Sequence, residues 1–103
     1  MKALTVPPAA LADPNAIEMF RVWIAEKGLH CSLRVGMYVD NKKVSETEAW
    51  GVIFADAIRQ IGAALEAQGV GDRASLVAQI SERLDSELDA PAGRSEGQLI
   101  LSN

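Results

Sequence analysis

The chain has 103 residues, of which 10 are Lys or Arg and 14 are Asp or Glu, so its formal net charge is -4. This length fits one domain, the acidic balance argues against nucleic-acid binding, and the lone Cys31 excludes an internal disulfide and is typical of a reducing compartment. No apolar run could span a membrane and no secretory signal pattern occurs, so we expect a cytoplasmic protein without nucleic-acid or membrane partners.

The N-terminal segment, residues 1–12, is predicted to be an extended arm. The Pro7-Pro8 pair restricts its own φ angles and pushes the preceding residue toward extended geometry. Lys2–Val6 is one candidate for an edge strand. Asp13-Pro14 has the pattern of a helix start, with a capping residue followed by proline at the first helical position.

Two segments in the first half of the chain predict a β-hairpin. Residues 29–39 alternate strictly between apolar and other side chains, and this period of two indicates a half-buried strand. Residues 18–26 fit either a helix continuing from Pro14 or a strand rich in Phe, Val, Trp and Ile. We favour the strand, because Glu26-Lys27-Gly28 fits a hairpin turn that would bring the two segments together.

A two-residue Lys27-Gly28 loop would set the register of this hairpin. Arg21 would then lie opposite Arg34, and Ile24 opposite Cys31. One face would be wholly apolar, with Phe20, Val22, Ile24, Cys31, Leu33 and Val35. A slip by one residue would mix the two faces, which favours this arrangement.

Two helices are predicted downstream, over residues 46–68 and 72–88. Ser45-Glu46-Thr47-Glu48 is a capping box for the first, Gly69 ends it, and Asp72 caps the second. The expected apolar stripes are Trp50, Ile53, Phe54, Ala57, Ile58, Ile61 and Leu65 on the first helix, and Leu76, Val77, Ile80, Leu84 and Leu88 on the second. Glycines at 51 and 62 inside the first helix point to close packing there, since each costs about 1 kcal/mol relative to alanine.

These elements predict a single α+β domain over residues 1–89, with both helices packed on one face of a small antiparallel sheet. Two strands alone are marginal, so a third is expected from Lys2–Val6, from Gln98–Leu101 or from a second subunit. The exposed hairpin edge favours a homodimer. Residues 90–103 are predicted to be a flexible tail, with a late edge strand at 98–101 as the alternative.

Several short motifs resemble a family of small proteobacterial proteins that carry a domain of unknown function. The motifs are Val6-Pro7-Pro8, Asp13-Pro14, Arg21-Val22-Trp23-Ile24-Ala25, Gly28-Leu29-His30, Ser32-Leu33 and Ala49-Trp50-Gly51. The resemblance covers residues 6–65 and implies a bacterial, cytoplasmic α+β protein, but no activity. The chain departs from the family pattern by a longer loop over residues 39–48.

The second face of the predicted hairpin carries the candidate binding residues, which are Arg21, Trp23, His30, Ser32 and Arg34. Two opposed guanidinium groups need an anion, supplied by this chain, by a protein partner or by a small acidic ligand. Trp23 beside them could stack on an arginine or on an aromatic ring. In the purely structural alternative, an internal carboxylate neutralises both arginines and the N-terminal arm covers Trp23.

No catalytic or metal-binding motif accompanies this face. His30 and Cys31 are neighbours on a strand, so their side chains point to opposite faces, and we predict Cys31 to be an inert core residue. One His and one Cys without ligand spacing predict no metal and no cofactor. We therefore predict a non-enzymatic protein-interaction or binding module. The alternatives are a small-anion binding protein or enzyme that uses the arginines as a clamp with His30 as acid or base, and an acidic chaperone-like adaptor.

Overall fold

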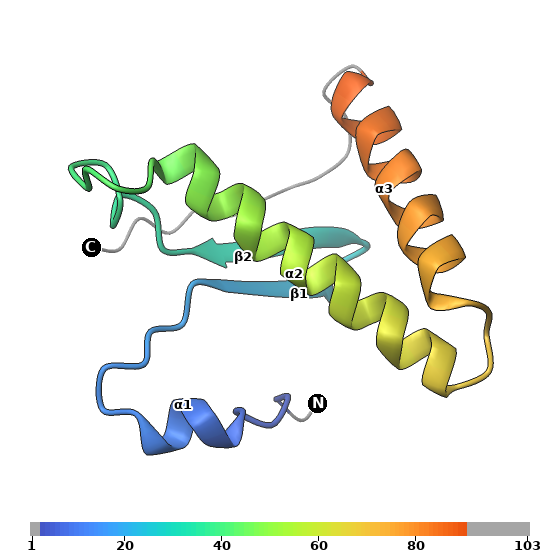
Figure 1. Ribbon diagram of the computed structural model, residues 1–103, viewed down its shortest axis with the longest axis horizontal. Coiled ribbons are helices and arrows are strands. Elements are labelled where there is room, and N and C mark those ends of the chain that lie inside the picture. The colour runs from blue at the N-terminus through green and yellow to red at the C-terminus, as the bar shows by residue number, and fades with distance from the viewer. Residues whose placement is uncertain (1–2, 91–103) are drawn as a thin grey trace. The chain divides into compact units, whose positions relative to one another are not determined.

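The computed structural model describes residues 3–90 (Figure 1). Its elements are helix α1 (Pro8–Ala12), strands β1 (Phe20–Ala25) and β2 (Gly28–Leu33), and helices α2 (Glu46–Ala67) and α3 (Arg73–Asp89). Contacts group the described residues into two compact units, one ending at Val35 and the other beginning at Gly36. Within residues 3–90, no helix has both the length and the apolar character needed to cross a membrane.

The predicted α+β class is confirmed, since an antiparallel hairpin and two long helices are present. Residues 3–6 form no strand. The predicted tail from residue 91 and its strand at 98–101 lie outside the described residues. A single domain over residues 1–89, with both helices on one face of the sheet, stays a prediction.

The N-terminal segment differs from the predicted extended arm, because residues 8–12 form the short helix α1. Pro8 stands in its first turn, where a missing N–H is tolerated. Asp13 ends the helix by donating its N–H to the Ala9 carbonyl, and its carboxylate accepts from the Asn15 N–H at 2.8 Å. Asp13-Pro14 is therefore a helix end, and its interpretation as a helix start is wrong.

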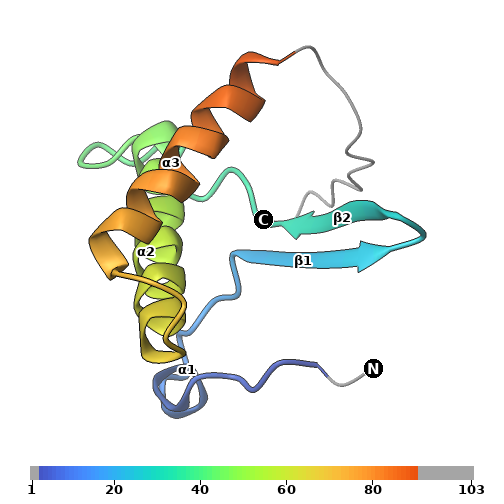
Figure 2. The same cartoon turned by 90° about the vertical axis from the view of Figure 1, so that its right-hand side faces the viewer.

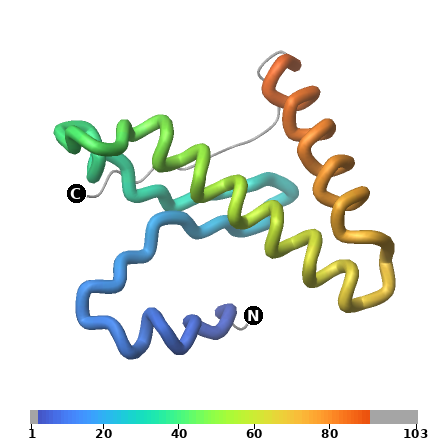
Figure 3. Tube along the Cα trace, viewed as in Figure 1, coloured from blue at the N-terminus to red at the C-terminus, as the bar shows by residue number. Residues whose placement is uncertain are grey.

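Strands β1 and β2 form the predicted hairpin, whose path can be followed in Figure 3. The turn lies one residue earlier than expected. Glu26 and Lys27 occupy the turn with φ angles of 49° and 63°, the left-handed pair that a type I′ turn requires. Ala25 therefore faces Gly28, and Arg21 faces Ser32. The predicted Lys27-Gly28 loop and the opposition of Arg21 to Arg34 are wrong.

The two faces of the hairpin nevertheless keep their predicted composition. The register differs from the expected one by two residues, and a shift by an even number leaves every side chain on its own face. One face carries Phe20, Val22, Ile24, Leu29, Cys31 and Leu33, while Arg21 and Trp23 share the other with His30 and Ser32. Cys31 faces Val22 as a free, half-buried thiol rather than a fully buried one.

Strand β2 ends at Leu33, so its predicted continuation through Val39 is wrong. Gly36 adopts a φ of 101°, which turns the chain out of the extended geometry. The backbone N–H groups of Gly36 and Tyr38 then donate to the carboxylate of Glu46, each at 2.8 Å. These contacts bind the segment to the start of α2, and the alternation of apolar residues beyond Leu33 does not mark a strand.

The backbone of the hairpin turn is strained, because left-handed backbone at a non-glycine residue costs about 1–2 kcal/mol. We expect Glu26→Asn with Lys27→Gly to stabilise the hairpin by about 1–2 kcal/mol, since that pair is preferred in type I′ turns. Slower amide exchange at Trp23 and His30 would measure the gain. The control Lys43→Gly, at a loop position without positive φ, should only lose stability. An unchanged exchange rate in the turn variant would contradict the assigned strain.

Both predicted helices are confirmed to within about two residues at each end. The Glu48 N–H donates to Ser45 Oγ at 3.1 Å, which is the first bond of the predicted capping box. The Glu48 carboxylate accepts from the Ser45 hydroxyl at 3.0 Å, whereas the second bond of a capping box would come from the Ser45 backbone N–H. Gly69 follows α2 with a φ of 78°. The Asp72 carboxylate then caps α3 by accepting from the Ser75 N–H at 3.1 Å, and α3 turns back beside α2 (Figure 2).

The two helices pack closely at Gly62, one of the two buried residues of α2. A Cβ atom added there would lie 2.6 Å from Val77 Cγ2 and 3.4 Å from the Arg73 carbonyl oxygen. The close packing expected at Gly62 is therefore confirmed. At Gly51 it is wrong, because among the described residues no atom apart from the adjoining helix backbone lies within 4 Å of an added Cβ.

Candidate functional site

The open end of the hairpin, opposite the turn, brings both candidate arginines to Glu18. Arg21 donates from Nε and Nη2 to the Glu18 carboxylate at 2.8–3.1 Å. Arg34 donates from Nε to the Glu18 carbonyl oxygen at 3.1 Å, and its backbone N–H donates to the Met19 carbonyl at 3.0 Å. For Arg21, the anion that the sequence required is thus a carboxylate of the same chain.

A small hollow of about 70 Å³ lies at this open end. Its lining comes from both strands and their flanks, namely Glu18, Met19, Phe20, Arg21, Ser32, Leu33 and Arg34. The volume of the hollow is far below the roughly 300 Å³ at which sites for drug-sized ligands begin. Three of the five candidate residues, Arg21, Ser32 and Arg34, meet there.

The other two candidates, Trp23 and His30, face each other nearer the turn. The His30 ring nitrogen Nε2 lies 3.1 Å from the Ala25 carbonyl oxygen, so a proton on Nε2 would be donated to it. His30 is therefore held by the backbone of the hairpin itself. The Trp23 residue is 42% exposed, which leaves part of its indole open on this face.

Strand β1 is more exposed than strand β2. Five of the six β1 residues are exposed, whereas all but one of the β2 residues are half-buried. Ile24 is 82% exposed and Val22 is 44% exposed. The sequence indicated an exposed hairpin edge, and the structure identifies β1 as the more open of the two.

The backbone of β1 also presents hydrogen-bonding groups at this edge. In a two-residue hairpin the pair next to the turn, here Ala25 and Gly28, is hydrogen-bonded, and alternate pairs follow. The Arg34 N–H to Met19 carbonyl bond continues the same alternation. Val22 and Ile24 belong to the intervening pairs, so their N–H and C=O groups point outward. No strand within residues 3–90 lies along that edge.

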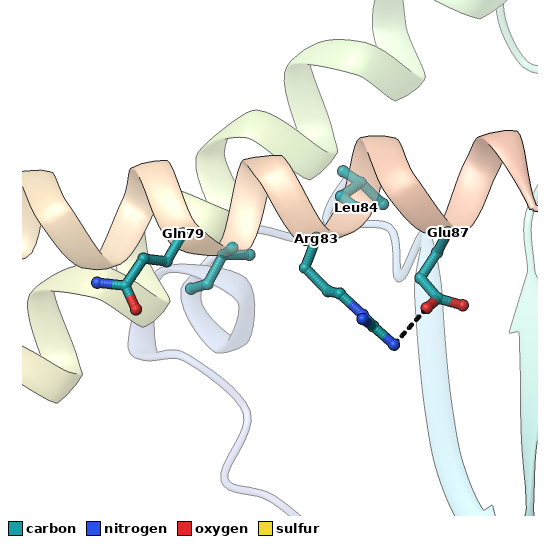
Figure 4. A pocket seen from close by; sticks show the side chains of 5 residues that line it. Gln79, Arg83, Leu84 and Glu87 are labelled. Atoms are coloured by element: carbon teal, nitrogen blue, oxygen red, sulfur yellow. Dashed lines mark ion pairs between the residues drawn. The ribbon is translucent and has the colours of Figure 1, made fainter.

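A second hollow, of about 430 Å³, lies on the flank of α3 (Figure 4). Its lining residues are Gln79, Ile80, Arg83, Leu84 and Glu87, and Arg83 and Glu87 form an ion pair of 2.6 Å across it. All five come from one helix, so this is an open helix flank. The apolar stripe predicted for this helix is half-buried near Val77, but Leu88 at its far end is 73% exposed.

The strongest electrostatic feature is the Glu46 carboxylate, which sequence reasoning treated only as part of a helix cap. It accepts from the Gly36 and Tyr38 N–H groups and from Trp50 Nε1 at 2.9 Å. These donors, Gly36 first, hold the pKa of Glu46 below its usual value of 4.5. Gly36 and Tyr38 lie ten and eight residues before Glu46, at positions that no helical spacing identifies, whereas Trp50 lies one helical turn after it. No three His, Cys, Asp or Glu side chains of residues 3–90 gather as metal ligands.

Comparison with known proteins places the chain in a family. Residues 3–92 match the family model of a domain of unknown function, DUF5076. A solved structure from the photosynthetic bacterium Rhodopseudomonas palustrus CGA009, described as a "putative pyruvate dehydrogenase", is 21% identical, with a TM-score of 0.65 and 93% of each chain covered. At that identity the likeness supports the fold alone, and no curated protein matches the chain. Because the family model spans nearly all the described residues, the chain belongs to the DUF5076 family, a domain of unknown function as the resemblance implied.

Proposed function

We propose that the protein is a non-enzymatic interaction module that binds an extended protein strand along the outer edge of β1. The exposed edge itself supports this proposal, because Val22 and Ile24 direct backbone N–H and C=O groups outward. An unpaired edge offers main-chain hydrogen bonds to an added strand, while pockets and side chains on the two faces of the sheet determine which strand binds.

The composition of β1 supports the same proposal. Proteins protect open edges with proline, lysine, bulges or inward-pointing charges, and β1 has no proline, lysine or bulge. Its only charged residue, Arg21, is neutralised by Glu18. The three consecutive residues Val22, Trp23 and Ile24 are apolar, strand-favouring and exposed. A bare edge of this kind promotes aggregation, so we infer that an occupant covers it in the working protein.

The contacts of the arginines favour this interaction module over the small-anion alternative. Arg21 already has two of its nitrogens on the Glu18 carboxylate, which also lines the hollow. A second anion entering there would be repelled by that carboxylate and would have to displace it. The dehydrogenase description of the similar structure is not carried over, because the likeness supports the fold alone.

Site-specific photo-crosslinking in the cells that produce the protein tests the proposal. We expect a photoreactive phenylalanine analogue in place of Ile24, on the β1 edge, to form a covalent adduct with a protein that mass spectrometry identifies. The same analogue in place of Arg59, an exposed position of α2, is the control. Adducts at position 24 and none at position 59 would support the module. No adduct at 24, or equal adducts at both positions, would contradict it.

A further inference from the structure

We propose that the strand which pairs with β1 is β1 of a second copy of this chain, antiparallel, with Val22 opposite Val22 on a twofold axis. This inference rests on the proposed function of the β1 edge and specifies the partner. The β1 edge is the more exposed one, since β2 is largely half-buried. A twofold interface requires a surface that is complementary to itself, and β1 meets that requirement.

The self-complementarity follows from the order of the residues in β1. With the axis at Val22, Phe20 lies opposite the partner's Ile24, so the apolar faces of the two hairpins become continuous. On the other face, Arg21 lies opposite the partner's Trp23, and symmetry repeats this contact. A guanidinium group over an indole is a favourable cation–π pair, and the exposed Trp23 offers the surface for it.

The two neighbouring antiparallel registers, with the axis at Arg21 or at Trp23, are poorer. An axis at Arg21 would set two like charges directly opposite each other, which destabilises a strand pair. An axis at Trp23 would place Arg21 opposite the partner's Ala25 and forgo both Arg–Trp contacts. The Val22 register does bring Glu18 opposite the partner's Glu26, just outside β1. Arg21 already neutralises Glu18, which reduces that repulsion.

The mass of the full-length protein in solution tests for the second copy. By light scattering after size exclusion, at about 100 µM, we expect twice the chain mass of 11.0 kDa. Val22→Pro removes an outward N–H and no hydrogen bond within the hairpin, so it should halve the measured mass. Val22→Thr keeps the N–H and the strand preference and should remain dimeric. Circular dichroism verifies that each variant is folded.

Cysteine pairing tests the register. In a Cys31→Ser background, Val22→Cys should form a disulfide between two copies under mild oxidation, because facing residues of this type lie about 5.5 Å apart at Cα. Ile24→Cys is the matched control. Each Ile24 would lie four residues, about 13 Å, from the partner's Ile24, which is too far for a disulfide. A disulfide at 24 without one at 22 would overturn the proposed register.

Two further outcomes would overturn the self-pairing. A wild-type monomer whose Ile24 photo-crosslinks to a different protein would refute the second copy as partner but leave the interaction module standing. A wild-type monomer whose Val22 and Ile24 amides resist hydrogen exchange would show that another part of the same chain covers the edge. That result would contradict both the self-pairing and the proposed module.

Discussion

Replacing Gly62 by alanine is expected to lower the free energy of unfolding by about 1–2 kcal/mol, although alanine is the better helix former. The new Cβ would lie 2.6 Å from Val77 Cγ2, closer than two carbon atoms can approach. Val77 is β-branched and has one strongly preferred rotamer in a helix, so it cannot turn aside cheaply. Overpacking costs about 1–3 kcal/mol, which exceeds the gain of about 1 kcal/mol in helix propensity.

The same substitution at Gly51 is the control, because there an added Cβ has no neighbour within 4 Å among the described residues apart from the adjoining helix backbone. Gly51→Ala is therefore expected to raise the free energy of unfolding by up to about 1 kcal/mol. Adding Val77→Ala should recover part of the loss at Gly62 by removing the clashing methyl group. Urea denaturation of the single and double variants measures this coupling. A stabilising Gly62→Ala would show that α3 does not lie against α2 at that point.

Replacing Glu46 by glutamine is expected to lower the stability of the protein and to make that stability less sensitive to acidic pH. Both carboxylate oxygens accept hydrogen bonds, Oε1 from the Tyr38 N–H and Oε2 from the Gly36 N–H and Trp50 Nε1. A glutamine side chain has the same shape, but it turns one of these acceptors into an NH2 group that faces a donor. The segment from Gly36 to Tyr38 would then lose one of its two hydrogen bonds to the start of α2.

The pH dependence follows from the direction of the pKa shift. Because Glu46 has a folded-state pKa below 4.5, the folded state favours the ionised carboxylate. Its contribution to stability is present above the unfolded pKa of about 4.5 and is lost as the pH falls through the lower folded value. The melting temperature, measured between about pH 6 and pH 3, should therefore fall less steeply with decreasing pH in Glu46→Gln than in the wild type.

Glu48→Gln is the matched control for this prediction. Glu48 lies in the same helical turn, and a capping box accepts Gln as well as Glu, so its stability should change little. The indole N–H resonance of Trp50 should move in Glu46→Gln, because that N–H is bonded directly to Glu46. Identical pH profiles for the wild type and Glu46→Gln would contradict the role assigned to this carboxylate.

The candidate site was predictable in composition but not in geometry. Alternation along the chain assigned Arg21, Trp23, His30 and Ser32 to one face, and the even shift of register preserved that assignment. The sequence offered Glu18 and Glu26 as possible internal partners of the arginines but did not choose between them. A carboxylate three residues before a strand residue meets it only when the chain bends in the right direction. Nor did the sequence separate the two edges of the hairpin, since their exposure depends on what covers each strand.

Features that depend on neighbouring residues could be inferred from the amino-acid sequence alone. Ser45 and Asp72 cap α2 and α3, and Gly69 follows the end of α2, because caps and helix ends are satisfied within a few residues. The folded structure was needed to locate the turn at Glu26 and Lys27, whose side chains carry no preference for left-handed backbone. The folded structure was also needed to locate the end of β2. The chain after Leu33 is held by hydrogen bonds from Gly36 and Tyr38 to Glu46, which lies eight to ten residues farther along the chain.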